Sequence, residues 1–109
     1  MTTSEKKPIK GASLSLLARQ PYTTRRLFEK LLQKGYCHDE IENIIEWCGE
    51  AGYLDDASWA VRASERKHAK GWDRRKVYAY LKSYGISRED AENALNMLAW
   101  EQTGIREYE

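Results

Sequence analysis

Apolar residues recur along this chain at intervals of three and four, which is the spacing of one face of an α-helix. Between residues 23 and 35, for example, Leu27, Phe28, Leu31 and Leu32 fall on one such face. No segment alternates apolar and polar residues as a strand would, and glycine follows four of the periodic segments. The pattern predicts an all-α protein with six helices, at about residues 12–20, 23–35, 38–51, 56–70, 73–85 and from 87 onward.

The later helices show the same periodicity, and Thr23, Asp73 and Ser87 stand where N-caps are expected. Ser87 and Asp90 have the spacing of a capping box, with Asp in place of Glu. From the third helix to the sixth we expect the buried residues to be Ile41, Ile44, Ile45, Cys48, Trp59, Ala60, Ala63, Val77, Tyr78, Leu81, Ala91, Ala94, Leu95 and Leu98.

The chain matches itself when it is shifted by fifty residues. Tyr22 then falls on Trp72, Leu31 on Leu81, and Gly35 falls on a glycine fifty residues later. Such a period indicates a tandem array of helical units that bury their apolar faces against their neighbours. We therefore predict two three-helix units in an extended or curved array.

The predicted organisation has three parts. These are a flexible N-terminal tail over residues 1–11, a first three-helix repeat over 12–52, and a second repeat with a C-terminal tail over 53–109. A unit of about 50 residues buries little surface alone. We therefore expect the two repeats to share an interface, with Trp47 and Trp59 as its bulky contributors.

Charge is strongly segregated along the chain, although the net charge is only +1. Residues 1–35 sum to +6, residues 36–56 to −7, residues 57–86 to +6 and residues 87–109 to −4. Each unit therefore has a basic first part and an acidic last part. Patches of one sign create a directional field even when the total charge is small.

The basic segments supply the candidate partner-binding residues. On one helix of the second unit, Arg62, Arg66 and Lys70 follow one another at intervals of four, which places three cations on one stripe. The full candidate set is Arg25, Arg26, Lys30, Arg62, Arg66, Lys67, Lys70, Arg74, Arg75 and Lys76. These cations would suit an acidic protein surface or a phosphate backbone, and an ordinary solvated face is the alternative reading.

Other candidate chemistry has simpler structural explanations. Asp55 and Asp56 precede a helix, where an N-cap is expected rather than a metal site or an acid–base pair. The sequence contains four potential zinc ligands: Cys37, His38, Cys48 and His68. Their spacing does not match the paired-ligand pattern of zinc sites. Four aromatic residues could stack on nucleic-acid bases: Trp72, Tyr78, Tyr80 and Tyr84. For Tyr78, a place in the core is the simpler explanation.

Signals for an enzyme, a cofactor or a membrane span are missing from the sequence. It contains no phosphate-binding loop, nucleophile elbow or paired-histidine motif, and no apolar run approaches about 20 residues. The two cysteines read as reduced thiols. We therefore expect a cytoplasmic, monomeric protein that is not an enzyme and has no catalytic residue, metal or cofactor.

A combination of short motifs resembles the RecX family, bacterial regulators of the recombinase RecA. Glu46-Trp47-Cys48, Gly52-Tyr53-Leu54-Asp55-Asp56, Gly71-Trp72, Leu81 to Gly85 and Ile86-Ser87-Arg88-Glu89 carry this resemblance, which covers about residues 12–100. Positions where the chain departs from the family pattern include Ser58, Trp59, Asp73, Arg74, Tyr78 and Tyr80. Family members usually carry three repeats, and a third would begin near residue 112, so we expect a short or truncated form.

The resemblance implies a non-catalytic protein that binds within the groove of the RecA nucleoprotein filament and limits recombinase activity in DNA repair, recombination and the SOS response. Independently of the resemblance, three-helix units with basic helices are also compatible with sequence-independent DNA binding. The acidic third helix argues against uniform wrapping by DNA, because its field repels phosphates.

Overall fold

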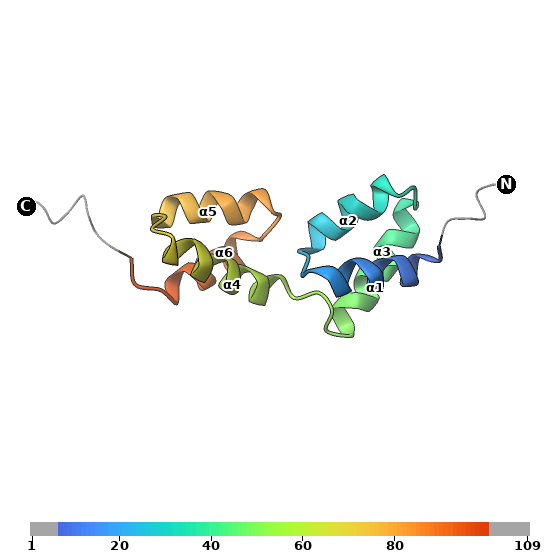
Figure 1. The fold of residues 1–109 in the computed structure, drawn as a ribbon, viewed down its shortest axis with the longest axis horizontal. Coiled ribbons are helices and arrows are strands. Elements are labelled where there is room, and N and C mark those ends of the chain that lie inside the picture. The colour runs from blue at the N-terminus through green and yellow to red at the C-terminus, as the bar shows by residue number, and fades with distance from the viewer. Residues whose placement is uncertain (1–6, 101–109) are drawn as a thin grey trace, which may run out of the picture. The chain divides into compact units, whose positions relative to one another are not determined.

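The computed structural model describes residues 7–100, which contain six α-helices and no strand, so the all-α prediction is confirmed. The chain divides into two compact units, residues 1–59 and residues 60–109. Figure 1 shows the helices in chain order, from blue to red. Within residues 7–100, no helix combines the length and apolar character that crossing a bilayer requires.

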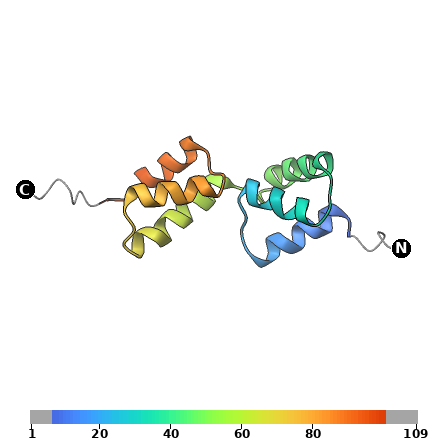
Figure 2. The same cartoon turned by 90° about the horizontal axis from the view of Figure 1, so that it is seen from above.

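The first unit contains α1 (Ile9–Arg19), α2 (Thr24–Gln33) and α3 (His38–Glu50), and each of these helices contacts the other two (Figure 2). Leu27, Leu31 and Ile41 are fully buried at the centre of this unit. Cys48 joins them with no exposed surface, and burial raises the pKa of its thiol. The predicted apolar faces of α2 and α3 therefore form one core.

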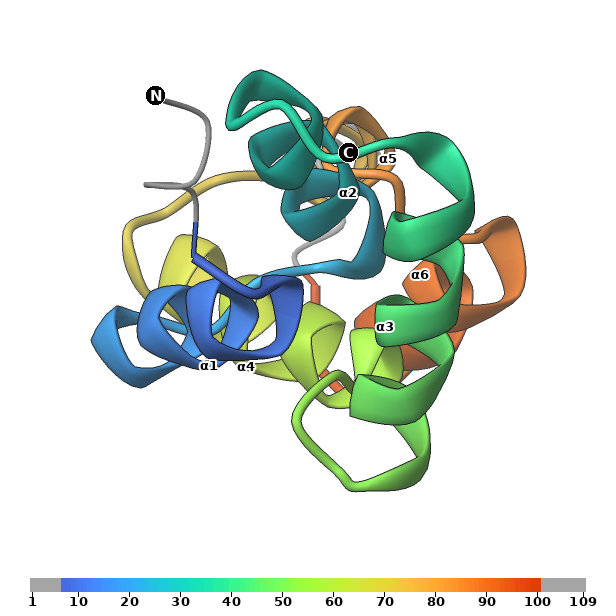
Figure 3. The ribbon, with the colours of Figure 1, turned by 90° about the vertical axis from the view of Figure 1, so that its right-hand side faces the viewer.

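The second unit is formed by α4 (Asp56–Ala69), whose first turn lies in the range of the first unit, with α5 (Arg74–Ser83) and α6 (Arg88–Asn96). Helices α5 and α6 pack against each other. Figure 3 shows the ribbon viewed from one end. Val77, Leu81 and Leu95 are fully buried. Small residues complete this core, as predicted: Ala60, Ala63, Ala91 and Ala94 are buried with them.

The helix boundaries follow from local chemistry that repeats in both units. Thr23 Oγ1 accepts the N–H of Arg26 at 3.2 Å, and Asp73 Oδ1 accepts the N–H of Lys76 at 2.8 Å, so both residues are the N-caps that the sequence predicts. Ser87 Oγ likewise accepts the N–H of Asp90 at 3.1 Å. The glycines after α2 and α5 have φ angles of 98° and 87°, which is the left-handed conformation that commonly ends helices.

The structure differs from the predicted boundaries at the first helix. α1 begins at Ile9, three residues earlier than predicted, because Pro8 is its N-cap and the carbonyl of Pro8 accepts the N–H of Ala12 at 3.0 Å. Residues 9–11, which the sequence assigns to the tail, therefore belong to the helix. Residues 1–6 of the predicted N-terminal tail and residues 101–109 at the other end of the chain lie outside the described residues.

Several residues predicted to be buried lie nearer the surface. Leu32 is 40% exposed, whereas Phe28, Ile45, Trp59 and Tyr78 are only partly buried. Leu98 follows the end of α6 and is also partly buried. In α2, α3, α4 and α5 the buried stripe is therefore narrower than the apolar stripe of the sequence.

Trp47, expected at an interface between the repeats, has neighbours within the first unit. Its ring centroid lies 5.7 Å from that of Tyr53, and Lys10 Nζ lies 4.3 Å from the Trp47 ring. The shared interface itself stays a prediction.

Candidate interaction surfaces

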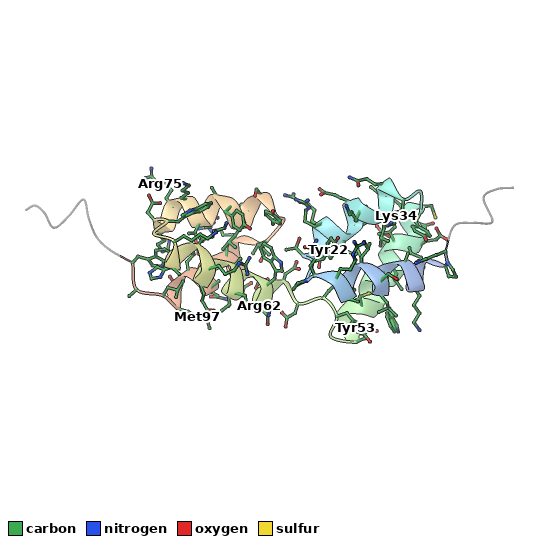
Figure 4. All side chains as sticks on the ribbon, viewed as in Figure 1. Tyr22, Lys34, Tyr53, Arg62, Arg75 and Met97 are labelled. Carbon is green, nitrogen blue, oxygen red and sulfur yellow. The ribbon has the colours of Figure 1, made fainter. Side chains whose placement is uncertain are left out.

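The ten predicted partner-binding cations lie at the surface of three helices. Arg25, Arg26 and Lys30 are exposed on α2 of the first unit. In the second unit, Arg62, Arg66 and Lys67 belong to α4, Lys70 follows it directly, and Arg74, Arg75 and Lys76 form the first turn of α5. All ten are exposed except Lys67, which is partly buried. Figure 4 labels Arg62 and Arg75 on the ribbon.

The position of the cations at the start of α5 is electrostatically unfavourable. The N-terminal turn of a helix carries a partial positive charge, and each cation there costs about 0.3–1 kcal/mol. The first turn of α5 nevertheless holds Arg74 and Arg75 and contains no acidic residue. The carboxylate of Asp73 at the N-cap offsets part of this cost, but helix stability does not explain the two arginines.

In the first unit, an acidic neighbour partly neutralises the basic surface. Glu29 lies 4.0 Å from Arg25 and 3.5 Å from Arg26, measured between carboxylate oxygen and guanidinium Nε. These pairs are about half exposed and contribute little to stability. They nevertheless reduce the net positive charge that α2 presents.

The second unit organises its cations around aromatic rings instead. Lys67 Nζ lies 4.6 Å from the Trp72 ring and 4.7 Å from the Tyr80 ring, and Lys76 Nζ lies 4.4 Å from Trp72. Tyr80 also packs beside Tyr84, with ring centroids 4.9 Å apart. We call Lys67, Trp72, Lys76, Tyr80 and Tyr84 the aromatic–lysine cluster.

Burial raises the pKa of Tyr80, and the neighbouring Tyr84 raises it further. Arg66 opposes this shift, because its guanidinium hydrogen-bonds Tyr80 and favours the phenolate. At neutral pH Tyr80 therefore stays protonated, and the cluster is cationic. The sequence identified these aromatic residues as possible base-stacking groups, but it did not indicate that lysines would lie against them.

A second basic surface lies on α5 and α6. It includes Arg88, which the sequence did not indicate as a partner-binding residue. Arg74 and Arg75 of α5 line a shallow hollow of about 560 Å³ together with Tyr78, Arg88 and Glu92. Arg74 Nη2 donates to Asn96 Oδ1 at 2.9 Å, and Arg88 Nε lies 3.5 Å from Glu92 Oε2. Arg88 is isolated in the sequence within an acidic segment, so only the packing of α5 on α6 connects it with the other arginines.

The prediction that one of the two aspartates at the start of α4 is its N-cap is confirmed for Asp55, whereas Asp56 has a different partner. Asp55 accepts the Ser58 N–H at 3.1 Å and the Ser58 hydroxyl at 2.9 Å, as an N-cap does. Asp56 Oδ1 accepts the backbone N–H of Thr24 at 2.8 Å. It thereby supplies a carboxylate to the start of α2, whose own first turn has none.

The described residues hold no group of three or more His, Cys, Asp or Glu side chains that could bind a metal ion. Of the potential ligands, Cys37 is exposed at the N-cap of α3, whereas Cys48 is buried in the core. Within this part of the chain, interaction surfaces are the strongest candidates for function.

Known proteins that resemble this chain share its three-helix domain and its fold. The family model described as RecX, first three-helix domain, matches residues 10–48. A protein of Vibrio vulnificus named regulatory protein RecX is 33% identical over 85 residues, covering 78% of this chain and 56% of the relative. The protein of that name in Salmonella paratyphi C is 39% identical over 57 residues, covering 52% of this chain and 34% of the relative.

The fold is similar to the crystal structure of RecX from Lactobacillus salivarius, with a TM-score of 0.79 and 22% identity, over 83% of this chain and 59% of that one. The chain spans about half the length of the Vibrio relative that it matches, and about a third of the Salmonella one. The matched three-helix domain and the similar relatives support the assignment of this chain to the RecX family, and the Lactobacillus structure shows that the fold is shared.

Proposed function

We propose that this protein binds the filament of the RecA recombinase through its exposed cations and restrains recombinase activity. Membership of a family of regulatory proteins supports the proposal. The main support is that the seven candidate cations of the second unit lack carboxylate partners among the described residues. Their charge therefore remains available to a partner.

The proposed contact set comprises all ten cations, with the second unit contributing more than the first. Glu29 offsets part of the charge of Arg25 and Arg26, whereas the aromatic–lysine cluster combines charge with large ring surfaces. Tyrosine, tryptophan and arginine are the residues that most often dominate the free energy of protein–protein binding. A protein bound in this way would hinder the addition of RecA subunits or the exchange of strands.

Binding to RecA with and without single-stranded DNA tests the proposal. The protein should co-sediment with RecA filaments assembled on single-stranded DNA, and binding should weaken as salt screens the cations. Equal retention by single-stranded DNA without RecA, or no retention by the filament, would contradict it.

Sequence-independent DNA binding is the second candidate, and the aromatic–lysine cluster favours it. Aromatic rings next to cations are the usual elements of surfaces that bind single-stranded nucleic acid. If about six phosphates are contacted, the affinity for DNA alone should fall with salt at a log–log slope of about −5 for a duplex and about −4 for a single strand. A flat salt response, or no binding at physiological salt, would eliminate this candidate.

A further inference from the structure

The hollow on α5 and α6 differs from the equivalent surface of the first unit in two exchanges that both increase its capacity for anions. The fifty-residue shift places Ala79 on Glu29, and Arg75 on Arg25. Arg25 has Glu29 as its partner at 4.0 Å. Arg75 has an alanine there instead, and within residues 7–100 its guanidinium has no hydrogen bond or ion pair.

The second exchange opens the space beside that guanidinium. In the first unit, Phe28 and His38 pack edge to face with ring centroids 5.0 Å apart. The equivalent residues of the second unit are Tyr78 and Arg88, which both line the hollow of about 560 Å³. A ring pair is thus replaced by an accessible phenol and a guanidinium.

Two of the three arginines that line the hollow have partners within the second unit. Arg74 donates a hydrogen bond of 2.9 Å to Asn96, and Arg88 lies 3.5 Å from Glu92 in an exposed pair that orders it only weakly. The lining therefore carries three guanidinium groups and one carboxylate. Guanidinium groups bind carboxylates through paired, charge-assisted hydrogen bonds, and a positioned group loses less conformational entropy on binding.

We propose that this hollow, formed by Arg74, Arg75, Tyr78, Arg88 and Glu92, is a docking site for an acidic peptide segment of a partner protein. The excess of positive charge selects a carboxylate-rich partner. Glu92 argues for a peptide over a nucleic acid, because its carboxylate can accept hydrogen bonds from peptide N–H groups, whereas a phosphodiester backbone has no donor to offer it. Tyr78 and the aliphatic stems of the arginines offer apolar contact to the neighbouring side chains of such a peptide.

The proposal deepens the proposed function, since Arg74 and Arg75 belong to the same contact set, and it specifies the chemistry of the partner at these two residues. The test is fluorescence anisotropy of the full chain with a short labelled peptide that alternates glutamates with alanine and leucine. The control peptide replaces every glutamate with glutamine. We expect binding of the glutamate peptide that weakens with salt, and much weaker binding of the glutamine peptide.

Variants assign the binding to the hollow. Arg75→Glu should weaken binding of the acidic peptide about tenfold, because it removes a charge-assisted contact and adds repulsion. Arg25→Glu, at the equivalent position of the first unit, is the matched control and should change it less than about twofold. Ala79→Glu restores the partner that Arg25 has, and should weaken binding about twofold or more without removing a cation.

Three results would overturn the proposal: equal binding of the two peptides, equal effects of Arg25→Glu and Arg75→Glu, or an oligothymidylate that binds the hollow more tightly than the peptide and is more affected by Arg75→Glu. Unchanged far-UV circular dichroism shows that each variant is folded. Co-sedimentation with RecA filaments is a separate readout. Filament binding without peptide binding would refute the docking site alone, and peptide binding without filament binding would refute the proposed function alone.

Discussion

The two units have equivalent cores but different surfaces. Leu27 and Leu31 of the first unit, and Val77 and Leu81 of the second, are all fully buried at equivalent positions. On the exposed side of the same two helices, Glu29 becomes Ala79 and Lys30 becomes Tyr80. Packing therefore preserves the repeat, while the unpaired cations and the aromatic cluster are concentrated in the second unit. A duplicated fold can in this way keep one unit as a scaffold and adapt the other for binding.

Truncation of the equivalent leucines Leu31 and Leu81 should have the largest effect and tests whether the two cores are equivalent. Leu31→Ala and Leu81→Ala each remove a fully buried side chain, and each should lower the free energy of unfolding by about 2–5 kcal/mol. Urea denaturation followed by circular dichroism measures this loss. Hydrogen exchange then shows which unit is weakened, and strongly unequal costs would contradict equivalent cores.

The glycines that end α2 and α5 provide a second matched pair. Gly35→Ala and Gly85→Ala force a Cβ into a left-handed backbone, and each should cost about 1–2 kcal/mol. Gly49 is the control because it lies inside α3 and a Cβ there meets no atom within 4 Å. Gly49→Ala should be stabilising by about 0.5–1 kcal/mol, so thermal unfolding should move in opposite directions for the two kinds of variant.

The N-caps should give a smaller and nearly equal effect in both units. Thr23→Ala and Asp73→Ala each remove one side-chain acceptor from a helix start, at a cost of about 1 kcal/mol. Thr23 is buried whereas Asp73 is exposed, so the threonine variant should cost slightly more. Denaturation midpoints measure the difference, and a larger cost at Asp73 would contradict the comparison.

Cys37→Ser introduces the cap of the second unit into the first and should have the smallest effect. Ser87, the equivalent residue, accepts the N–H of Asp90 at 3.1 Å, and a hydroxyl is a stronger acceptor than a thiol. The exchange should stabilise α3 by about 0.5 kcal/mol, seen as a small rise in melting temperature. A fall would show that the Cys37 thiol makes a favourable contact of its own.

The sequence predicts this fold well wherever the determining chemistry is local. The caps at Thr23, Asp73 and Ser87 and the core leucines follow from residue type and spacing, and the structure confirms them. Leu32, in contrast, is exposed because α1 and α3 cover only part of the apolar face of α2. How much of a helix face is buried depends on its neighbours and cannot be read from that helix alone.

The candidate surfaces could be predicted as regions of charge but not as sites. The ten cations can be identified in the sequence. Side-chain positions, however, decide that Arg25 forms an ion pair with Glu29 and that Lys67 lies against two aromatic rings. The hydrogen bond between Arg74 and Asn96 joins residues far apart in sequence. Such differences between the two units appear only when the repeats are compared in three dimensions.

The single-stranded-DNA-dependent ATPase activity of RecA tests most directly whether the second unit carries the regulatory surface. The unmodified protein should inhibit it, and the charge-reversal variant Arg66→Glu/Lys70→Glu should need a much higher concentration for the same inhibition. The first-unit variant Arg25→Glu/Lys30→Glu, which reverses the same number of charges, should have a smaller effect, because Glu29 already offsets Arg25. Unchanged inhibition by the second-unit variant, or equal loss in both, would contradict the account.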